Sequence, residues 1–337
     1  MIEGPRYIQE EESMRNAKLI SVSVAAILGL LWDSAIAQKD YPNKSVRVLV
    51  PYPPGGITDF VTRITALELG KSFGQTFVVD NRPGANSILA VDMVSKATPD
   101  GYTLGTVIAA HAANQTLYSK LPYDSVKSFE QVSLIGTAPL IVCAANSLAA
   151  NSVKDLVELA KARPGQLTFA SSGIGAAAHL TTELLMSTTG IKMVHVPYKG
   201  TAPALQDLMG GQINVMMDTP SSLLPHVRAG KIKSLGMASE KRVAVAPEIP
   251  TLIESGVPVV GGTWVGLLAP AGTPKPVVEK LSREVAVAVR RPEIKERFAQ
   301  LGIEPVGNTP AEFTQFLQAE VAKWAKVIKD ANVKIDN

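Results

Sequence analysis

The order strand, small-residue loop, helix recurs along this sequence and restricts its fold more than any other feature. The strand pattern Val46-Arg47-Val48-Leu49-Val50 leads into Pro53-Pro54-Gly55-Gly56, and a helical pattern of apolar residues follows. The same order returns at 167–185 and again at 194–209. Such an alternation predicts an α/β fold whose sheets are mostly parallel and carry helices on both faces.

Two of the predicted helices come with an expected buried face. The helix after the first loop should bury an apolar face that consists of Phe60, Val61, Ile64 and Leu67. Near the end of the chain, Thr309, Pro310 and Glu312 combine an N-cap, a first-turn proline and a capping carboxylate. The helix that they start should bury the apolar stripe within 313–328 in a core.

The N-terminal segment has the pattern of an export signal. Two basic residues precede the apolar run 19–31, and Ala35-Ile36-Ala37 follows as a small-x-small cleavage sequence. The run is too short to span a bilayer, which takes about 20 residues. We therefore expect a signal peptide at 1–37, cleavage after Ala37 and a periplasmic mature protein. The charges before Met14 are mostly acidic, which makes Met14 an alternative start.

The charge balance limits the classes of partner. The chain carries 33 Lys and Arg against 30 Asp and Glu, a formal net charge of +3, without a long cationic run. This mild excess argues against nucleic acid as the main partner and is compatible with a small anionic ligand.

The residues that could carry chemistry argue against catalysis and metal binding. The sequence contains four histidines: His111, His179, His195 and His226. Their spacings are not those of metal ligands, so we expect neither a metal nor a cofactor. Ser171 and Ser172 follow a strand without a G-x-S-x-G elbow, and His179 should point away from their loop, which leaves a periplasmic hydrolase as a minor alternative. Cys143, the single cysteine, lies in an apolar stretch that predicts a buried structural thiol.

Two loops in different halves of the chain have the composition of anion cradles. Residues 53–59 and 171–176 each follow a strand, are rich in small residues and open a helix. A helix start leaves backbone N–H groups unpaired and carries a partial positive charge, which favours a bound carboxylate or phosphate. A tight turn with an N-cap would explain either loop alone. The two loops together, facing each other across a cleft, could hold both ends of a dicarboxylate.

Two carboxylates lie close to these helix starts. Asp59 falls in the first turn after the first loop, where it either stabilises the helix end or contacts a ligand. Asp218 follows the strand pattern 213–217, at the position where doubly wound folds place their ligands. It could accept a hydrogen bond from an amino or hydroxyl group of a solute.

Short segments in a fixed order give the chain a family resemblance. They are Tyr41-Pro42-Asn43-Lys44, Val50-Pro51-Tyr52-Pro53-Pro54-Gly55-Gly56 with Asp59, Asn81-Arg82-Pro83-Gly84-Ala85, Pro99-Asp100-Gly101-Tyr102-Thr103-Leu104, Leu121-Pro122-Tyr123-Asp124, His195-Val196-Pro197-Tyr198-Lys199-Gly200, Pro225-His226-Val227 with Ala229-Gly230-Lys231, and Gly266-Leu267 with Ala269-Pro270-Ala271-Gly272-Thr273-Pro274. Their order and spacing resemble those of the Bug-type solute-binding proteins of tripartite tricarboxylate transporter systems.

The resemblance implies a type II periplasmic-binding-protein fold, in which crossing strands join two α/β lobes around a ligand. Lobe 1 would comprise residues 41–140 and 265–337, and lobe 2 residues 141–264. Members of this family typically capture organic acids and hand them to a membrane permease, and some serve sensing. We therefore expect a monomeric receptor that delivers a small organic carboxylate to permease subunits; a co-sensor for a membrane histidine kinase is the alternative.

Carried over by position, the resemblance also implies the ligand contacts. In lobe 1 they are Tyr52, Gly55, Gly56, Thr58 and His111. In lobe 2 they are Ser171, Ser172, Gly173, Gly175 and Ala176, with Tyr198 and Asp218 at the rim. The resemblance implies no catalytic residue. Tyr52 stands where the family usually has Phe, and Asn86 where it usually has Gly, so the identity of the ligand stays open.

Overall fold

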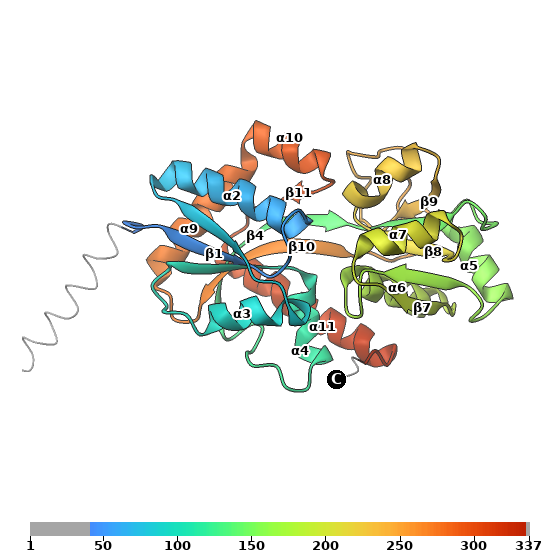
Figure 1. Ribbon diagram of the computed structural model, residues 1–337, viewed down its shortest axis with the longest axis horizontal. Helices are drawn as coiled ribbons and strands as arrows, with labels where there is room; N and C mark the ends of the chain where they lie inside the picture. Colours follow the sequence, from blue (N-terminus) through green and yellow to red (C-terminus); the bar gives the residue numbers. More distant parts are fainter. Residues whose placement is uncertain (1–40, 335–337) are drawn as a thin grey trace, which may run out of the picture. The chain divides into compact units, whose positions relative to one another are not determined.

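Two mixed β-sheets, each flanked by helices, organise the computed structural model, which describes residues 41–334 (Figure 1). Both sheets belong to one compact unit, Lys44–Asn337. The predicted signal peptide and the alternative start at Met14 lie outside the described residues. Within the described range, no helix is both long enough and apolar enough to cross a membrane.

The first sheet has the strand order β11-β4-β10-β3-β1-β2. Its strands are β1 (Val46–Val50), β2 (Phe77–Asn81), β3 (Thr103–Val107), β4 (Phe129–Pro139), β10 (Gly262–Pro270) and β11 (Glu304–Pro305). β1 pairs in parallel with β2 and β3, whereas β10 runs antiparallel to both β3 and β4.

The second sheet has the order β7-β6-β8-β5-β9. Its strands are β5 (Ile141–Ala145), β6 (Thr168–Ser171), β7 (Val194–Pro197), β8 (Val215–Asp218) and β9 (Ile232–Met237). β6 pairs in parallel with β7 and β8, and β5 runs antiparallel to β8 and β9.

The prediction of mostly parallel sheets is therefore wrong. In the described chain, four of the nine strand pairs are parallel. The parallel pairs come from the strand–helix–strand units, as the alternation predicted. The antiparallel pairs come from strands that enter or leave a sheet at the crossing between the two halves, and their direction cannot be read from the local pattern.

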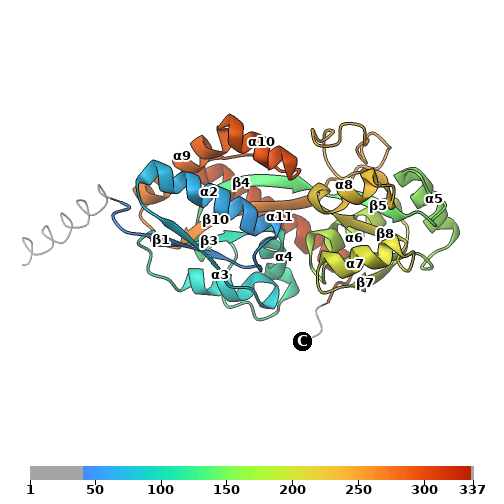
Figure 2. The same ribbon diagram turned by 45° about the horizontal axis from the view of Figure 1, so that its top comes forward.

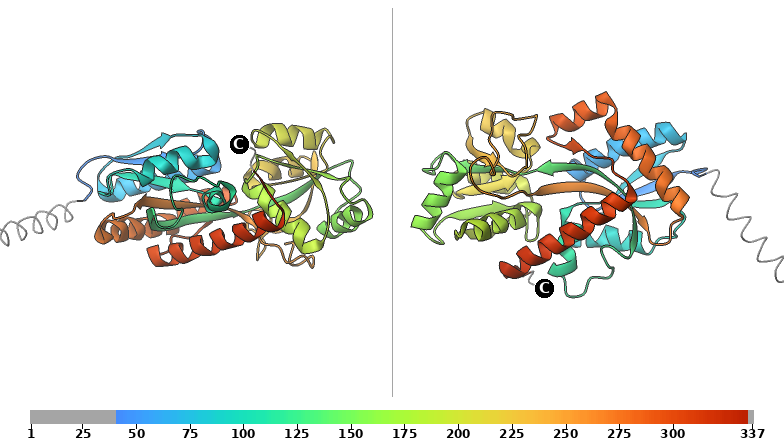
Figure 3. Two further views of the ribbon diagram at one scale, coloured as in Figure 1. Left: turned by 90° about the horizontal axis from the view of Figure 1, so that it is seen from below. Right: turned by 180° about the vertical axis from the view of Figure 1, so that it is seen from behind.

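Helices cover both sheets (Figure 1). They are α2 (Ile57–Phe73), α3 (Ile88–Ser95), α4 (Ala109–Leu117), α5 (Val153–Ala162), α6 (Ala177–Thr189), α7 (Thr201–Met209), α8 (Pro220–Arg228), α9 (Lys275–Arg290), α10 (Pro292–Gln300) and α11 (Pro310–Asp330), with a short 3₁₀ turn at Ala85–Ser87. The predicted capping box of α11 is confirmed: Thr309 accepts from the Glu312 N–H, and the Glu312 side chain accepts from the Thr309 N–H. Figure 3 shows α11 extending from the first half of the molecule toward the second, where it contacts α6.

The chain crosses between the sheets twice, at one place. β4 passes into β5 through Leu140, and the return passes through Gly261 into β10 (Figure 2). The Leu140 N–H donates to the Gly261 carbonyl at 3.3 Å, and the Leu140 carbonyl accepts from the Ala238 N–H at 2.8 Å. Two crossings bonded to each other are the hinge strands that the fold class requires. The lobe boundaries at residues 140/141 and 264/265 stay a prediction.

The predicted buried face of α2 is wrong in part. Val61 is buried, but Phe60 and Leu67 are 46% and 54% exposed. The helix instead turns threonines such as Thr62 and Thr65 toward the sheet and α9. The Thr62 hydroxyl is satisfied there because it donates to the Thr58 carbonyl four residues back, at 2.6 Å, whereas the Thr65 Oγ1 is buried without a partner in the described structure.

Cys143 and Glu320 are buried in the core, and the surroundings of each explain its state. Cys143 is fully buried in β5, as predicted, and burial raises the pKa of its thiol. Glu320 of α11 is only 7% exposed and accepts hydrogen bonds at 2.9 Å from the indole N–H groups of both Trp264 and Trp324. It also forms an ion pair with Lys323. One carboxylate thus satisfies two buried indoles, one of which lies on a crossing strand.

We predict that Glu320→Ala lowers the free energy of unfolding by about 2–4 kcal/mol, because two buried indole N–H groups lose their acceptor. Glu320→Gln keeps one oxygen and should cost less than half as much. Denaturant unfolding followed by tryptophan fluorescence measures both variants. Equal stability of Glu320→Ala and the wild type would contradict this role.

Candidate functional site

A cavity of about 620 Å³ lies where the carboxyl ends of strands from both sheets meet. The chain segments that line it follow β1, β3, β6 and β8, the position at which open α/β sheets bind ligands. Its lining consists of Tyr52, Pro53, Pro54, Gly55, Gly56, Ile57, Thr58, Phe60, Asn86, Ile108, Ala110, Leu140, Ser172, Gly173, Ile174, Ala176, Ala177, Ala178, Gly200, Thr201, Asp218, Thr219, Ser221, Ser222, Thr263 and Leu301.

Five helices of the described chain begin at this cavity: α2, α4, α6, α7 and α8. Their N-cap residues, which all line the cavity, are Gly56, Ile108, Ala176, Gly200 and Thr219. In the residues described, none of these five N-caps makes a side-chain capping bond. Among the described helices that start elsewhere, α5 and α11 are capped by Ser152 and Thr309, whereas α3, α9 and α10 also lack a side-chain cap. First-turn N–H groups and positive dipole ends therefore converge on the cavity without side chains to satisfy them.

The positive potential in the cavity comes from these backbone dipoles. The described lining contains no Lys, Arg or His side chain, and its one carboxylate is that of Asp218. Asp218 accepts hydrogen bonds at 2.7 Å from the Thr201 hydroxyl and at 2.7 Å from the Thr219 N–H. Burial raises the pKa of this carboxyl, and the hydrogen bonds act in the opposite direction without cancelling the effect.

Asp59, which does not line the cavity, holds the first loop (residues 53–59) in place. The Gly55 N–H donates to Asp59 at 3.0 Å, and Arg63 and Asn81 both reach the same carboxylate at 2.9 Å. Burial opposes the charged form, but hydrogen bonds from Arg63, Gly55 and Asn81 outweigh it and lower the Asp59 pKa. Of the two roles considered for Asp59, the geometry supports the structural one.

The second loop is held by two stacked imidazoles. His179 and His195 lie face to face, with ring centroids 3.8 Å apart and planes inclined by 12°. His195 Nε2 lies 2.7 Å from the Ser171 Oγ, and His179 Nδ1 accepts from the Gly175 N–H at 3.1 Å. The prediction that His179 points away from the loop is wrong, because side chains lean toward the N-terminus of their helix and Gly175 lies one turn before it.

A serine and a histidine are thus in hydrogen-bond contact, but not at the cavity. Ser171 has no exposed surface, and in the described structure it is absent from the cavity lining. Burial, and secondarily the neighbouring His179, lower the pKa of His195 to about 3. The pair therefore acts as a neutral support for the loop backbone, since the Gly173 N–H also donates to Ser171 Oγ at 3.2 Å.

The structure brings most of the predicted contact residues together. Those that line the cavity are Tyr52, Gly55, Gly56, Thr58, Ser172, Gly173, Ala176 and Asp218. Those that lie outside the lining are His111, Ser171, Gly175 and Tyr198.

The residues outside the lining have other contacts. His111 is fully buried, with Nε2 2.8 Å from the Ser125 carbonyl, and burial lowers its pKa to about 4. Gly175 has a φ of +78°, a left-handed conformation that favours glycine, and a Cβ there would lie 2.5 Å from the Leu117 side chain. The Tyr198 hydroxyl donates to Asp207 at 2.5 Å.

Sequence reasoning missed several lining residues. Thr201 and the group Thr219, Ser221 and Ser222 follow β7 and β8, so the rule that found the first two loops applies to them as well. Thr263 and Leu301 gave no local signal, because tertiary structure alone brings them to the cavity.

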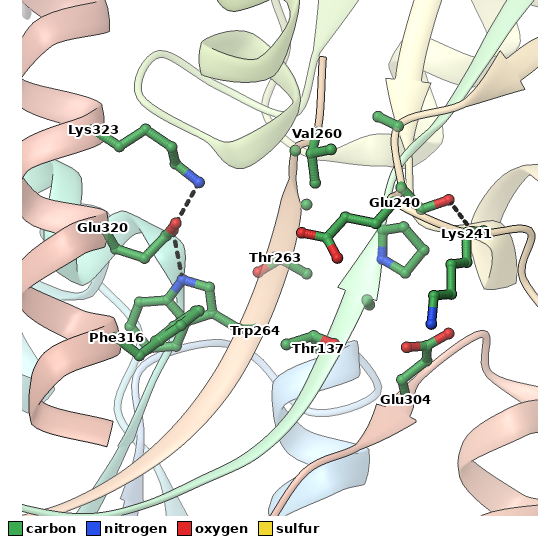
Figure 4. Close-up of a pocket in the computed structure, with 16 residues that line it drawn as sticks. Thr137, Glu240, Lys241, Val260, Thr263, Trp264, Glu304, Phe316, Glu320 and Lys323 are labelled. Carbon is green, nitrogen blue, oxygen red and sulfur yellow. Dashed lines mark hydrogen bonds and ion pairs between the residues drawn. The ribbon is translucent and has the colours of Figure 1, made fainter. Parts of the chain in front are cut away.

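A second cavity, of about 420 Å³, lies at the crossing strands (Figure 4). Figure 4 shows Trp264 and Phe316 on one side of it and Glu240, Lys241 and Glu304 on the other. Across the described residues there is no group of three or more His, Cys, Asp or Glu side chains placed to hold a metal ion.

Comparison with known proteins supports the family resemblance. The family model described as "Tripartite tricarboxylate transporter family receptor" matches residues 61–333. The solved periplasmic binding protein BugD is 36% identical, with a TM-score of 0.75 over 87% of this chain and 99% of its own.

Two ligand-bound structures are similar to the same degree. Rpa4515 of R. palustris with adipate is 35% identical, with a TM-score of 0.79 over 87% of this chain and 99% of its own. MatC from Rhodopseudomonas palustris with bound malate is 33% identical, with a TM-score of 0.74 over 86% of this chain and 100% of its own. The type II periplasmic-binding-protein fold is thereby confirmed, and the chain belongs to the receptor family of the tripartite tricarboxylate transporters.

Proposed function

We propose that this protein is a periplasmic receptor that captures a small organic carboxylate in the 620 Å³ cavity and passes it to membrane permease subunits without a catalytic step. One observation carries the proposal: five uncapped helix N-termini converge on a cavity with no cationic side chain in its described lining. Such an arrangement stabilises an anion through backbone N–H groups. The adipate and malate bound by Rpa4515 and MatC, both dicarboxylates, support the choice of anion.

The two loops supply complementary halves of the proposed site. On the first, Gly56 leaves the backbone open, since a Cβ there would meet no other atom within 4 Å, and Thr58 adds a hydroxyl. On the second, Ser172 and the backbone around Gly173 face the same cavity. Because the loops belong to different sheets, a dicarboxylate that contacts both would favour the closed arrangement of the lobes.

Direct binding measurements test the proposal. Native mass spectrometry of the freshly purified protein should reveal a co-purified small acid, and calorimetry with adipate and malate should give one site for at least one of them. No binding of either acid and no co-purified carboxylate would contradict carboxylate capture. Conversion of the acid during the titration would contradict the absence of a catalytic step.

We predict that Gly56→Val weakens carboxylate binding at least about tenfold, because the β-branched side chain blocks approach to the first-turn N–H groups. The fold should survive, since the Gly56 φ of −85° is accessible to valine and the Cβ has open space. Calorimetry measures the affinity and a thermal melt checks the fold. Unchanged affinity in a folded Gly56→Val protein would remove this loop from the site.

We predict that Asp218→Asn tightens the binding of a dicarboxylate severalfold at pH 7, because it removes the one negative charge of the described cavity lining. The raised pKa of Asp218 sets the sign of the pH effect: as pH falls toward it the carboxyl takes up a proton, so wild-type affinity should rise. Asp218→Asn should flatten that rise, which calorimetry between pH 5 and 8 measures. Weaker binding by Asp218→Asn would show instead that Asp218 accepts a hydrogen bond from the ligand.

A further inference from the structure

The crossing strand β10 holds a hydroxyl that has no partner. The Thr263 side chain is only 7% exposed, and its Oγ1 is buried without a hydrogen-bond partner in the described structure. Leaving a buried hydroxyl unpaired opposes folding, so proteins pair nearly all such groups with protein, water or ligand. Other atoms of Thr263 line the 620 Å³ cavity, so a change of its χ1 rotamer would bring the hydroxyl to a bound ligand, which makes a ligand the candidate partner.

Strand geometry gives the direction of the Thr263 side chain. The next residue, Trp264, points toward α11, where its indole N–H bonds Glu320 (Figure 4). Successive side chains of a strand point to opposite faces, so Thr263 lies on the face of β10 opposite to that of Trp264. Thr263 borders both cavities, as expected for a residue in the layer of strand that separates them.

The other hydroxyls around Asp218 already have protein partners. The Thr201 hydroxyl donates to Asp218 at 2.7 Å, and the Thr219 Oγ1 lies 3.0 Å from the Ser221 Oγ and 3.1 Å from the Ser222 Oγ. Thr263 differs from them because its hydroxyl is buried and unpaired among the described atoms. Its neighbour at the crossing, Leu140, offers the cavity an apolar surface.

We infer that the Thr263 hydroxyl donates a hydrogen bond to a carboxylate oxygen of the captured solute, as a contact from the hinge in addition to those from the two loops. The inference rests on the proposed function and extends it to a residue that determines specificity. A solute that places a carboxylate oxygen beside β10 satisfies this hydroxyl. One that places a methyl group there leaves the hydroxyl unpaired and is discriminated against.

The chain offers a matched control. Thr65 of α2 is 4% exposed, and its Oγ1 is likewise buried and unpaired within the described structure. It faces the apolar core near Val48 and Ile135 rather than the cavity. Replacing either threonine by the isosteric valine removes a hydroxyl of the same kind, but only Thr263 should matter for the ligand.

The test is calorimetry with adipate and malate on the wild type and on Thr263→Val, Thr263→Ser and Thr65→Val. Thr263→Val should weaken binding roughly tenfold to a hundredfold, the loss expected for a hydrogen bond to a charged group. Thr263→Ser keeps the hydroxyl and should stay within about threefold of the wild type, and Thr65→Val should bind like the wild type. Thermal melts without ligand check folding, and Thr263→Ala replaces any Thr263→Val protein that fails to fold.

The outcomes distinguish failure of the Thr263 contact from failure of carboxylate capture. Wild-type affinity in folded Thr263→Val, or an equal loss in Thr65→Val, would overturn the role of Thr263 and leave carboxylate capture standing. If the wild type binds neither acid, the proposed function fails and the inference fails with it.

Discussion

The satisfaction of helix N-termini is the constraint on which the site depends. Every α-helix starts with backbone N–H groups that lack a partner inside the helix, and a protein has to provide for them. This chain caps α5 and α11 with Ser152 and Thr309, yet begins five helices at one cavity with Gly56, Ile108, Ala176, Gly200 and Thr219, none of which caps through its side chain in the described structure. Unpaired backbone N–H groups would destabilise a protein core. Here the same groups are hydrogen-bond donors that a bound anion can accept from.

The mixed sheets explain how those helix starts come to face one another. In each sheet the parallel strands send their carboxyl ends, and the helices that follow, toward the same edge. The strands β4, β5 and β10 carry the chain between the halves; β4 pairs with β10, and the bond from Leu140 to Gly261 joins the two crossings. The two edges therefore meet across a cavity whose remaining wall is the crossing itself.

Short-range sequence patterns are enough to predict part of the cavity lining. The loops around Gly56 and Ser172 and the carboxylate of Asp218 were identified because strand ends, small residues and helix starts are encoded within a few positions of sequence. Family resemblance added His111 and Tyr198, which the structure places outside the cavity lining. Thr263 and Leu301 could not be found in this way, because only the crossing of the chain brings them to the cavity. Phe60 lies on the exposed side of α2 for a related reason: the helix buries threonines such as Thr62 and Thr65, which an apolar pattern does not register.

The absence of Lys and Arg from the described lining of the cavity has a consequence for how the protein meets its ligand. Fixed charges would draw an anion in from a distance, and dissolved salt would weaken that attraction. Backbone dipoles act over about one helix turn, and salt screens buried groups much less than exposed ones. A receptor built in this way would gain little speed of capture from low ionic strength. It would hold its solute with nearly constant affinity while the salinity outside the cell rises and falls.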